Sequence, residues 1–192
     1  MARPLLATLL LFTPLLATSA RADNLSVVVS IPEQRLYLFN ENGAKVNCYR
    51  VSTSRFGLGD IRNSYATPTG QLEIAGKVGD GAVPGTVFKH CHPTGEVCPV
   101  NAANRDPIVT RVLPLRGLER QNSMALPRGI YIHGTPDERN IGRPVSWGCI
   151  RMKSRDVIAL FALVQRGTRV EITTGRVGGF FGNAVRPANS RG

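Results

Sequence analysis

Cys149 and His133 are the residues of this sequence whose types and setting can carry covalent chemistry. A cysteine thiol is a weak nucleophile until a neighbouring base removes its proton. A histidine held at the end of a rigid strand can be that base, and His133 ends the apolar run 129–133. The pair is therefore a candidate nucleophile and base. From residue types alone, a structural histidine and a disulfide between Cys149 and Cys48 remain open alternatives.

The residues around Cys149 favour a reactive setting. Gly148 lets the backbone approach a substrate closely, and the amides of Gly148 and Cys149 are expected to stabilise an oxyanion. Basic side chains crowd the same stretch, and their charge is expected to lower the pKa of the thiol and to attract substrate carboxylates. These side chains are Arg139, Arg143, Arg151 and Lys153.

The elements that must position these residues are mostly strands. Alternating or β-branched segments predict strands at 25–31, 35–39, 45–52, 72–75, 108–113, 129–133 and 169–173. One principal helix is expected after the nucleophile loop, with Ser154 as its N-cap and Gly167 at its end. Its apolar stripe consists of Val157, Leu160, Phe161 and Val164. Residues 76–127 are the least regular part of the sequence, with 108–113 as the best strand candidate, and a lid over the site is one interpretation of this stretch. The expected fold class is mainly β and β-sandwich-like.

The N-terminus resembles an export signal. Residues 1–22 combine a basic start, a short apolar run and the small-residue site Ala20-Arg21-Ala22. The run is shorter than the roughly 20 apolar residues that span a bilayer. We expect cleavage after Ala22, a periplasmic catalytic domain at 23–174 that does not insert into the membrane, and a flexible basic tail at 175–192.

The charge balance points to an anionic partner. The chain has 24 Lys and Arg against 13 Asp and Glu, for a net charge of +11. Removing the signal takes away Arg3 and Arg21 and leaves +9, since 22 minus 13 is 9. A basic surface attracts anionic polymers. Export argues against nucleic acid, whereas peptidoglycan is rich in carboxylates.

The other cysteines allow two interpretations. Cys91 and Cys98 lie close in sequence and are expected to form a disulfide that staples a loop, as export permits. The alternative is a zinc site built from Cys91, Cys98, His90 and His92. Residues 90, 91 and 92 would alternate sides in an extended chain, so we expect no metal.

The motif around the candidate pair resembles the signature of YkuD-type L,D-transpeptidases. It comprises His133-Gly134-Thr135, a loop of twelve residues at 134–145, and Ser146-x-Gly148-Cys149-Ile150-Arg151-Met152. The resemblance extends to 34–38, 51–53, 67–70 and 167–172, and it spans about residues 25–173.

The resemblance implies a role for each catalytic residue. Cys149 would be the nucleophile and His133 the base, while the carbonyl of Gly134 would fix the imidazole tautomer. Arg151 matches an arginine of the family that can bind a carboxylate of the donor stem peptide, and its alternative role is a surface salt bridge.

Four further residues are expected to bind substrate. Trp147 stands where the family usually has histidine, so it either lines the donor site or packs under the loop. The others are Ser146, Gly148 and Tyr131.

The implied reaction joins peptidoglycan stem peptides in a cross-link of the 3–3 type or of the 1–3 type, with no cofactor. With water as acceptor the same site would be an L,D-carboxypeptidase, and a cysteine endopeptidase is a second enzymatic alternative. The non-enzymatic alternative is a wall-binding module, which would not need both Cys149 and His133.

Overall fold

The computed structural model describes residues 25–177. The predicted signal at 1–22 and most of the predicted tail at 175–192 lie outside these residues. The described part has ten strands: β1 (Ser26–Ser30), β2 (Arg35–Phe39), β3 (Lys45–Arg50), β4 (Gly70–Ile74), β5 (Thr86–Lys89), β6 (His92–Val97), β7 (Ile108–Gly117), β8 (Tyr131–Gly134), β9 (Ile150–Met152) and β10 (Arg169–Thr173). It also has helix α1 (Ser154–Leu163) and the short 3₁₀ helices η1 (Arg120–Asn122) and η2 (Glu138–Asn140).

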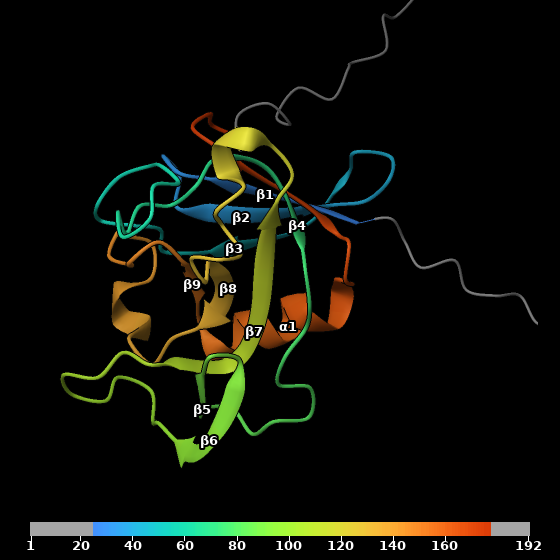
Figure 1. The fold of residues 1–192 in the computed structure, drawn as a ribbon. Coiled ribbons are helices and arrows are strands. Elements are labelled where there is room, and N and C mark those ends of the chain that lie inside the picture. Colours follow the sequence, from blue (N-terminus) through green and yellow to red (C-terminus); the bar gives the residue numbers. More distant parts are fainter. Residues whose placement is uncertain (1–24, 178–192) are drawn as a thin grey trace, which may run out of the picture.

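Hydrogen bonds link the strands in the order β3-β2-β1-β10-β4-β7-β5-β6, and β8 branches from β7 to pair with β9. β1 is parallel to β10 and antiparallel to β2. Figure 1 shows β1 to β4 gathered at one end of the molecule, with β7 running from them towards the β5–β6 hairpin and α1 lying beside it. The expected fold class, mainly β with one principal helix after the nucleophile loop, is confirmed.

Strand β7 joins the two parts of the fold. Its C-terminal end pairs with β4, its N-terminal end pairs with β5, and β8 pairs along residues 109–114. The pairing with β8 shifts register between Val109 and Val112, and Thr110 between them has a φ of 73°. Such an irregularity bends a strand and strengthens its twist. The bent strand is the support for β8, the strand that contains His133.

One apolar core fixes the strands on both sides of the candidate site. Its members come from β1, β2, β4, β7, β8, β9, β10 and α1, and include Val29, Leu36, Leu72, Leu113, Ile132, Ile150, Leu160 and Ile172. Each fully buried aliphatic side chain of this kind contributes about 1.5–3 kcal/mol relative to exposure. The burial of Ile132 on β8 and Ile150 on β9 in this core therefore fixes the position of these two short strands.

Helix α1 starts differently from the prediction. Ser154 is its first helical residue, and the cap position belongs to Lys153, which makes no side-chain cap hydrogen bond. The Ser154 amide instead donates to Oε1 of Glu138 at 2.8 Å. A carboxylate at a helix N-terminus satisfies a free amide and suits the helix dipole. The predicted N-cap is thus wrong, and Glu138 ties the nucleophile loop to α1. The helix ends at Leu163, before the predicted Gly167.

Residues 76–127 are more regular than predicted. They contain β7, which includes the predicted strand at 108–113, and also β5, β6 and η1, which were not predicted. His90 and Cys91 join β5 to β6, and both have positive φ, at 49° and 63°. A two-residue hairpin turn of type I′ requires this conformation, which is usually supplied by Asn and Gly. The hairpin was not predicted because His90 and Cys91 are not the residues that usually form such a turn.

Candidate active site

Parallel pairing of β8 with β9 brings Cys149 and His133 to one face. Ile132 pairs with Ile150 and His133 with Arg151, and Cys149 directly precedes β9. Side chains alternate along a strand, so the isoleucines enter the core while His133 and Arg151 share the other face. Cys149 lies level with Tyr131, whose amide donates to its Sγ at 3.4 Å.

The thiol of Cys149 is free and half-buried. Its Sγ donates to the carbonyl of Gly129 at 3.3 Å. The thiol is therefore held between the backbones of Gly129 and Tyr131 at the start of β8. The alternative disulfide with Cys48 is not formed, because both cysteines are free.

The imidazole of His133 is held in one tautomer. Nδ1 lies 2.8 Å from the carbonyl oxygen of Gly134, and the residue is only 4% exposed. A carbonyl can only accept a hydrogen bond, so Nδ1 carries the hydrogen and Nε2 keeps its lone pair. The predicted contact between His133 and Gly134 is present, and it leaves Nε2 able to accept a proton.

Burial keeps the resting pair uncharged. The pKa of His133 is lowered to about 4, mainly by burial and also by the positive charge of Arg151, while the hydrogen bond to Gly134 opposes the shift. Burial raises the pKa of Cys149 to about 11, although the Tyr131 amide, Arg151 and Arg128 each lower it. Of the four expected cations, Arg151 acts on the thiol pKa in the expected direction, but burial is the larger effect and the pKa is raised.

Ser146 and Gly148 shape the loop around the thiol. Ser146 Oγ donates to the Cys149 carbonyl at 2.6 Å and accepts from the Gly148 amide at 3.2 Å. Ser146 is fully buried, so it supports the nucleophile turn and does not line an open pocket, contrary to the prediction. Because the Gly148 amide is already bonded, the Cys149 amide is the remaining candidate of the two for an oxyanion hole.

Gly148 is required for steric reasons. Its φ is 114°, and an added Cβ would lie 3.0 Å from Cδ1 of Ile130 and 3.2 Å from the carbonyl oxygen of Ala66. Side chains rarely adopt this conformation. Its carbonyl accepts from Thr67 Oγ1 at 2.9 Å, which ties the nucleophile turn to loop 51–69. The glycine thus permits close packing of the two loops beside Cys149.

Arg151 forms a salt bridge with Asp106. Its guanidinium lies 2.6 Å from Oδ2 of Asp106, and Oδ1 of Asp106 accepts from Thr135 Oγ1 at 2.5 Å. Arg151 is buried, and the pair lies between the segment before β7 and the end of β8. The salt bridge that was the alternative role of Arg151 is present, and its carboxylate partner in this structure is Asp106.

Trp147 belongs to an exposed aromatic cluster that sequence reasoning missed. It is 50% exposed, and its ring lies 5.1 Å from that of Phe56 and 5.0 Å from that of Tyr65. The Arg55 guanidinium lies 4.7 Å from the centre of the Trp147 ring, within cation–π range. Trp147 therefore faces outward beside the thiol rather than packing beneath the loop.

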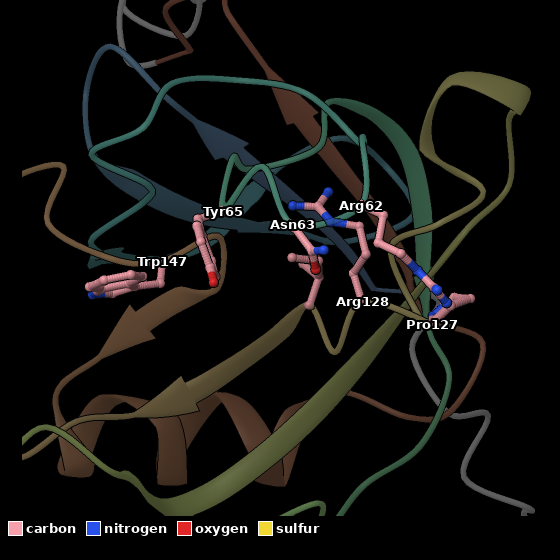
Figure 2. A pocket seen from close by; sticks show the side chains of 7 residues that line it. Arg62, Asn63, Tyr65, Pro127, Arg128 and Trp147 are labelled. Atoms are coloured by element: carbon pink, nitrogen blue, oxygen red, sulfur yellow. The ribbon is translucent and has the colours of Figure 1, made fainter.

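A pocket of about 360 Å³ opens beside the nucleophile turn. It is lined by Arg62, Asn63, Tyr65, Pro127, Arg128, Ile130 and Trp147. Figure 2 shows Trp147 and Tyr65 at one end of this pocket and Arg62 with Pro127 at the other. Ile130 lies between the two residues whose backbones contact the thiol, Gly129 and Tyr131. The pocket therefore lies next to the segments that hold the thiol, and Cys149 and His133 are not among its lining residues.

Arg128 anchors the loop that forms the opposite wall. Its guanidinium binds Oδ1 of Asp60 at 2.9 Å and the carbonyls of Gly59 and Ala66 at 3.0 and 2.7 Å. It also binds Ser64 Oγ at 3.2 Å. The side chains of Arg128 and Asp60 are 6% and 7% exposed. Nothing in the sequence pairs these two positions, which are 68 residues apart.

The predicted disulfide between Cys91 and Cys98 is absent, because both thiols are free. Cys91 lies in the hairpin turn before β6 and Cys98 directly after this strand, and six strand residues extend about 20 Å. A disulfide needs Cα atoms within about 7 Å. Cys91 instead hydrogen-bonds the side chain of Tyr131, whose pKa is raised to about 12, first by burial and then by this contact.

No group of three or more His, Cys, Asp or Glu side chains within residues 25–177 is arranged to hold a metal ion. The zinc alternative built on Cys91, Cys98, His90 and His92 is therefore not supported within this range. The helices in this range are also too short or too polar to cross a membrane.

Comparisons with known proteins agree with this geometry. The family model of the L,D-transpeptidase catalytic domain, YkuD, matches residues 24–172. A putative L,D-transpeptidase YkuD of Bacillus licheniformis is 57% identical over 42 residues, which are 22% of this chain and 26% of that protein. The probable L,D-transpeptidase YcfS of Escherichia coli is 28% identical over 165 residues, or 83% of this chain and 47% of that protein. The chain thus spans less than half the length of each of these curated relatives.

Solved structures share the fold. L,D-transpeptidase LdtMt1 in complex with imipenem has a TM-score of 0.50 and 20% identity, covering 79% of this chain and 59% of that one. L,D-transpeptidase 3 from Mycobacterium tuberculosis, with a faropenem-derived adduct, has a TM-score of 0.50 and 18% identity, covering 78% and 60%. With the family model matching most of its length, the chain belongs to the YkuD family of L,D-transpeptidase catalytic domains.

Proposed function

We propose that this protein is an L,D-transpeptidase that joins peptidoglycan stem peptides through a thioester on Cys149. The observation that carries the proposal is the setting of two side chains on neighbouring strands. A free thiol lies beside an open pocket, and a buried imidazole has its Nδ1 bound to the Gly134 carbonyl, so that Nε2 is a proton acceptor. Family membership supports acyl transfer as the reaction of this pair.

The first half-reaction forms the thioester. Because the resting thiol is protonated, His133 Nε2 takes the Cys149 proton as Sγ attacks the carbonyl of the donor. The Cys149 amide is the proposed donor to the oxyanion of the tetrahedral intermediate. The C–N bond then breaks, and the imidazolium returns the proton to the leaving amine.

The second half-reaction transfers the acyl group. An acceptor amine attacks the thioester carbonyl and loses a proton to His133 Nε2. The C–S bond breaks, the thiolate regains its proton, and the new amide is the cross-link. A donor carbonyl on meso-diaminopimelate gives a 3–3 bridge, which is the type we propose first, and one on L-Ala gives a 1–3 bridge.

We propose that this chemistry takes place in the periplasm. The proposal rests on residues 1–22, whose basic start, short apolar run and Ala20-Arg21-Ala22 are typical of a cleaved signal. Cell fractionation with intact-mass analysis tests it. A periplasmic protein that begins at about Asp23 supports export, and an uncleaved protein in the cytoplasm contradicts it.

The decisive experiment is incubation of the purified protein with muropeptides, followed by mass analysis of the products. We expect a cross-linked dimer together with a thioester adduct on Cys149. Cys149→Ala should abolish both, and Cys48→Ala on β3 is the matched control that should retain them. Cross-linking by Cys149→Ala would contradict the nucleophile. Release of a terminal residue without any dimer would indicate the carboxypeptidase instead.

A further inference from the structure

The arginines around the candidate site differ in whether they are free to bind a ligand. Arg151 is bound to Asp106, and Arg128 is bound to Asp60 and to the backbone of loop 51–69. Arg55 is stacked on Trp147. Arg62 lines the pocket, is exposed, and makes no hydrogen bond or ion pair with any residue between 25 and 177. Of the two arginines that line the pocket, Arg62 is therefore the one whose guanidinium is free to bind an anionic ligand.

The segment that contains Arg62 is held rigidly by its neighbours. Asn63 and Tyr65 have positive φ, at 61° and 53°. Asparagine tolerates this conformation, but for an aromatic residue it is unusual and costs of order 1 kcal/mol or more. Ser54 Oγ donates to the Tyr65 carbonyl at 2.6 Å, and Arg128 binds the segment on both sides of Tyr65. Backbone strain of this kind persists only where the surrounding structure enforces it.

The pocket combines a cationic end with an aromatic end. Figure 2 shows Arg62 beside Pro127, with Tyr65 and Trp147 at the far end and Asn63 between them. The aromatic rings and Pro127 form the apolar part of the lining, and Arg62, Asn63 and Arg128 form its polar part. A guanidinium presents a planar set of donors that fits a carboxylate in a bidentate manner. The pocket suits a short peptide that has a carboxylate near an apolar part.

We propose that Arg62 binds a carboxylate of the donor stem peptide. This inference rests on the proposed function and assigns to Arg62 the role that the sequence pattern suggested for Arg151. The guanidinium holds the carboxylate at one end of the pocket, while Ile130, which lines the pocket, stands between the two residues whose backbones contact Sγ of Cys149. The carboxylate is either the C-terminal one or one on a side chain of the stem, and both present the same chemistry to Arg62.

Trp147 makes binding measurable without catalysis. It is the single tryptophan of the chain and it lines the pocket, so its fluorescence reports on this site. The experiment titrates Cys149→Ala protein with a synthetic stem tetrapeptide that has free carboxylates. In that background, Arg62→Ala should raise the Kd about 10- to 100-fold, the loss expected for a hydrogen bond to a charged group. Arg62→Lys should recover part of the affinity.

Arg166 provides the matched control, because it is exposed in the turn after α1 and does not line the pocket. Arg166→Ala should leave the Kd unchanged. Peptides with one carboxylate at a time converted to the amide identify the source, since the effect of Arg62→Ala should vanish for the peptide that lacks the bound group. An equal Kd for the Arg62→Ala protein and its parent would overturn the inference, as would an effect that persists in every amide peptide.

The outcome separates the two proposals. If the muropeptide assay shows Cys149-dependent cross-linking but Arg62→Ala binds normally, the proposed function stands and the role of Arg62 is wrong. If Cys149→Ala still forms cross-links, the proposed function fails whatever the binding assay shows.

Discussion

The guanidinium of Arg151 is bound to the carboxylate of Asp106 at 2.6 Å, so the arginine next to the nucleophile on β9 is neutralised by the segment before β7. Asp106 also accepts from Thr135 Oγ1, directly after β8. The pair therefore connects three parts of the chain that surround His133. Arg151 remains close enough to lower the pKa values of both His133 and Cys149.

Removing Asp106 should destabilise the fold. Asp106→Ala leaves a buried guanidinium without its partner and Thr135 Oγ1 without an acceptor, and we expect a loss of about 1–3 kcal/mol in the free energy of unfolding. Urea denaturation followed by circular dichroism measures it. Glu96→Ala is the control, because the Glu96–Arg105 pair is exposed and should contribute little. Equal stability of both variants would contradict a structural role for Asp106.

Strands and the catalytic motif could be predicted from the sequence where the pattern is local. The bounds of β2 and β10 match the prediction, because β10 alternates buried Val170 and Ile172 with less buried neighbours and β2 is a short apolar run between polar segments. The contact between His133 and Gly134 also follows from adjacent residues of one motif. Local patterns are informative because a strand's own side chains decide its buried face.

The features that the sequence did not reveal depend on distant contacts or on burial. Arg128 and Asp60 show no pattern that links them, yet their ion pair anchors the loop that forms one wall of the pocket. The Glu138 side chain, and not the predicted Ser154 side chain, accepts a hydrogen bond at the N-terminus of α1. The two residues are 16 positions apart in the sequence, and the fold brings them together. The thiol pKa depends on how much protein surrounds Sγ, and this burial outweighs the nearby charges that the sequence does show.

The thiol of the resting protein should react slowly with an alkylating reagent near neutral pH. Raising the pKa from 9.0 to about 11 reduces the thiolate fraction about 100-fold at a given pH below both values. Iodoacetamide modification of Cys149, followed by mass analysis of peptides across pH 6–11, should rise towards the alkaline end. The denatured chain is the reference, with its thiol titrating near pH 8.5. Half-maximal reactivity near neutral pH in the folded protein would contradict a neutral resting pair.

The acid limb of catalysis should lie well below the range of an ordinary histidine. The lowered pKa means that His133 stays neutral, and so remains a base, until the pH falls towards about 4. We expect kcat/KM for donor turnover to be level from pH 7 to pH 5 and then to decline. Measuring unfolding at each pH separates loss of activity from loss of fold. A decline centred near pH 6.5 would mean that the imidazole titrates as a solvated group.

Arg128 should be essential for the loop that forms the pocket wall. Arg128→Ala leaves Asp60 buried without its cation, for which we expect a loss of about 3–5 kcal/mol in the free energy of unfolding. Arg128→Lys should not restore stability, because one ammonium cannot reach Asp60, Ser64 and two carbonyls together. Denaturation curves of the two variants test this. Wild-type stability of the lysine variant would show that the charge alone is sufficient.

Gly148→Ala should impair the site through lack of space as well as through backbone strain. Its φ of 114° disfavours any side chain, and the new Cβ would lie 3.0 Å from Ile130 and 3.2 Å from the Ala66 carbonyl. The control is Gly43→Ala in the β2–β3 turn, where φ is 73° and no atom lies within 4 Å of the added Cβ. Both variants should lose about 1 kcal/mol or more to backbone strain. Only Gly148→Ala should also reduce donor turnover, because its nucleophile turn must move away from Ile130 and so displace Cys149. Equal turnover by the two variants would show that the close packing at Gly148 does not position the thiol.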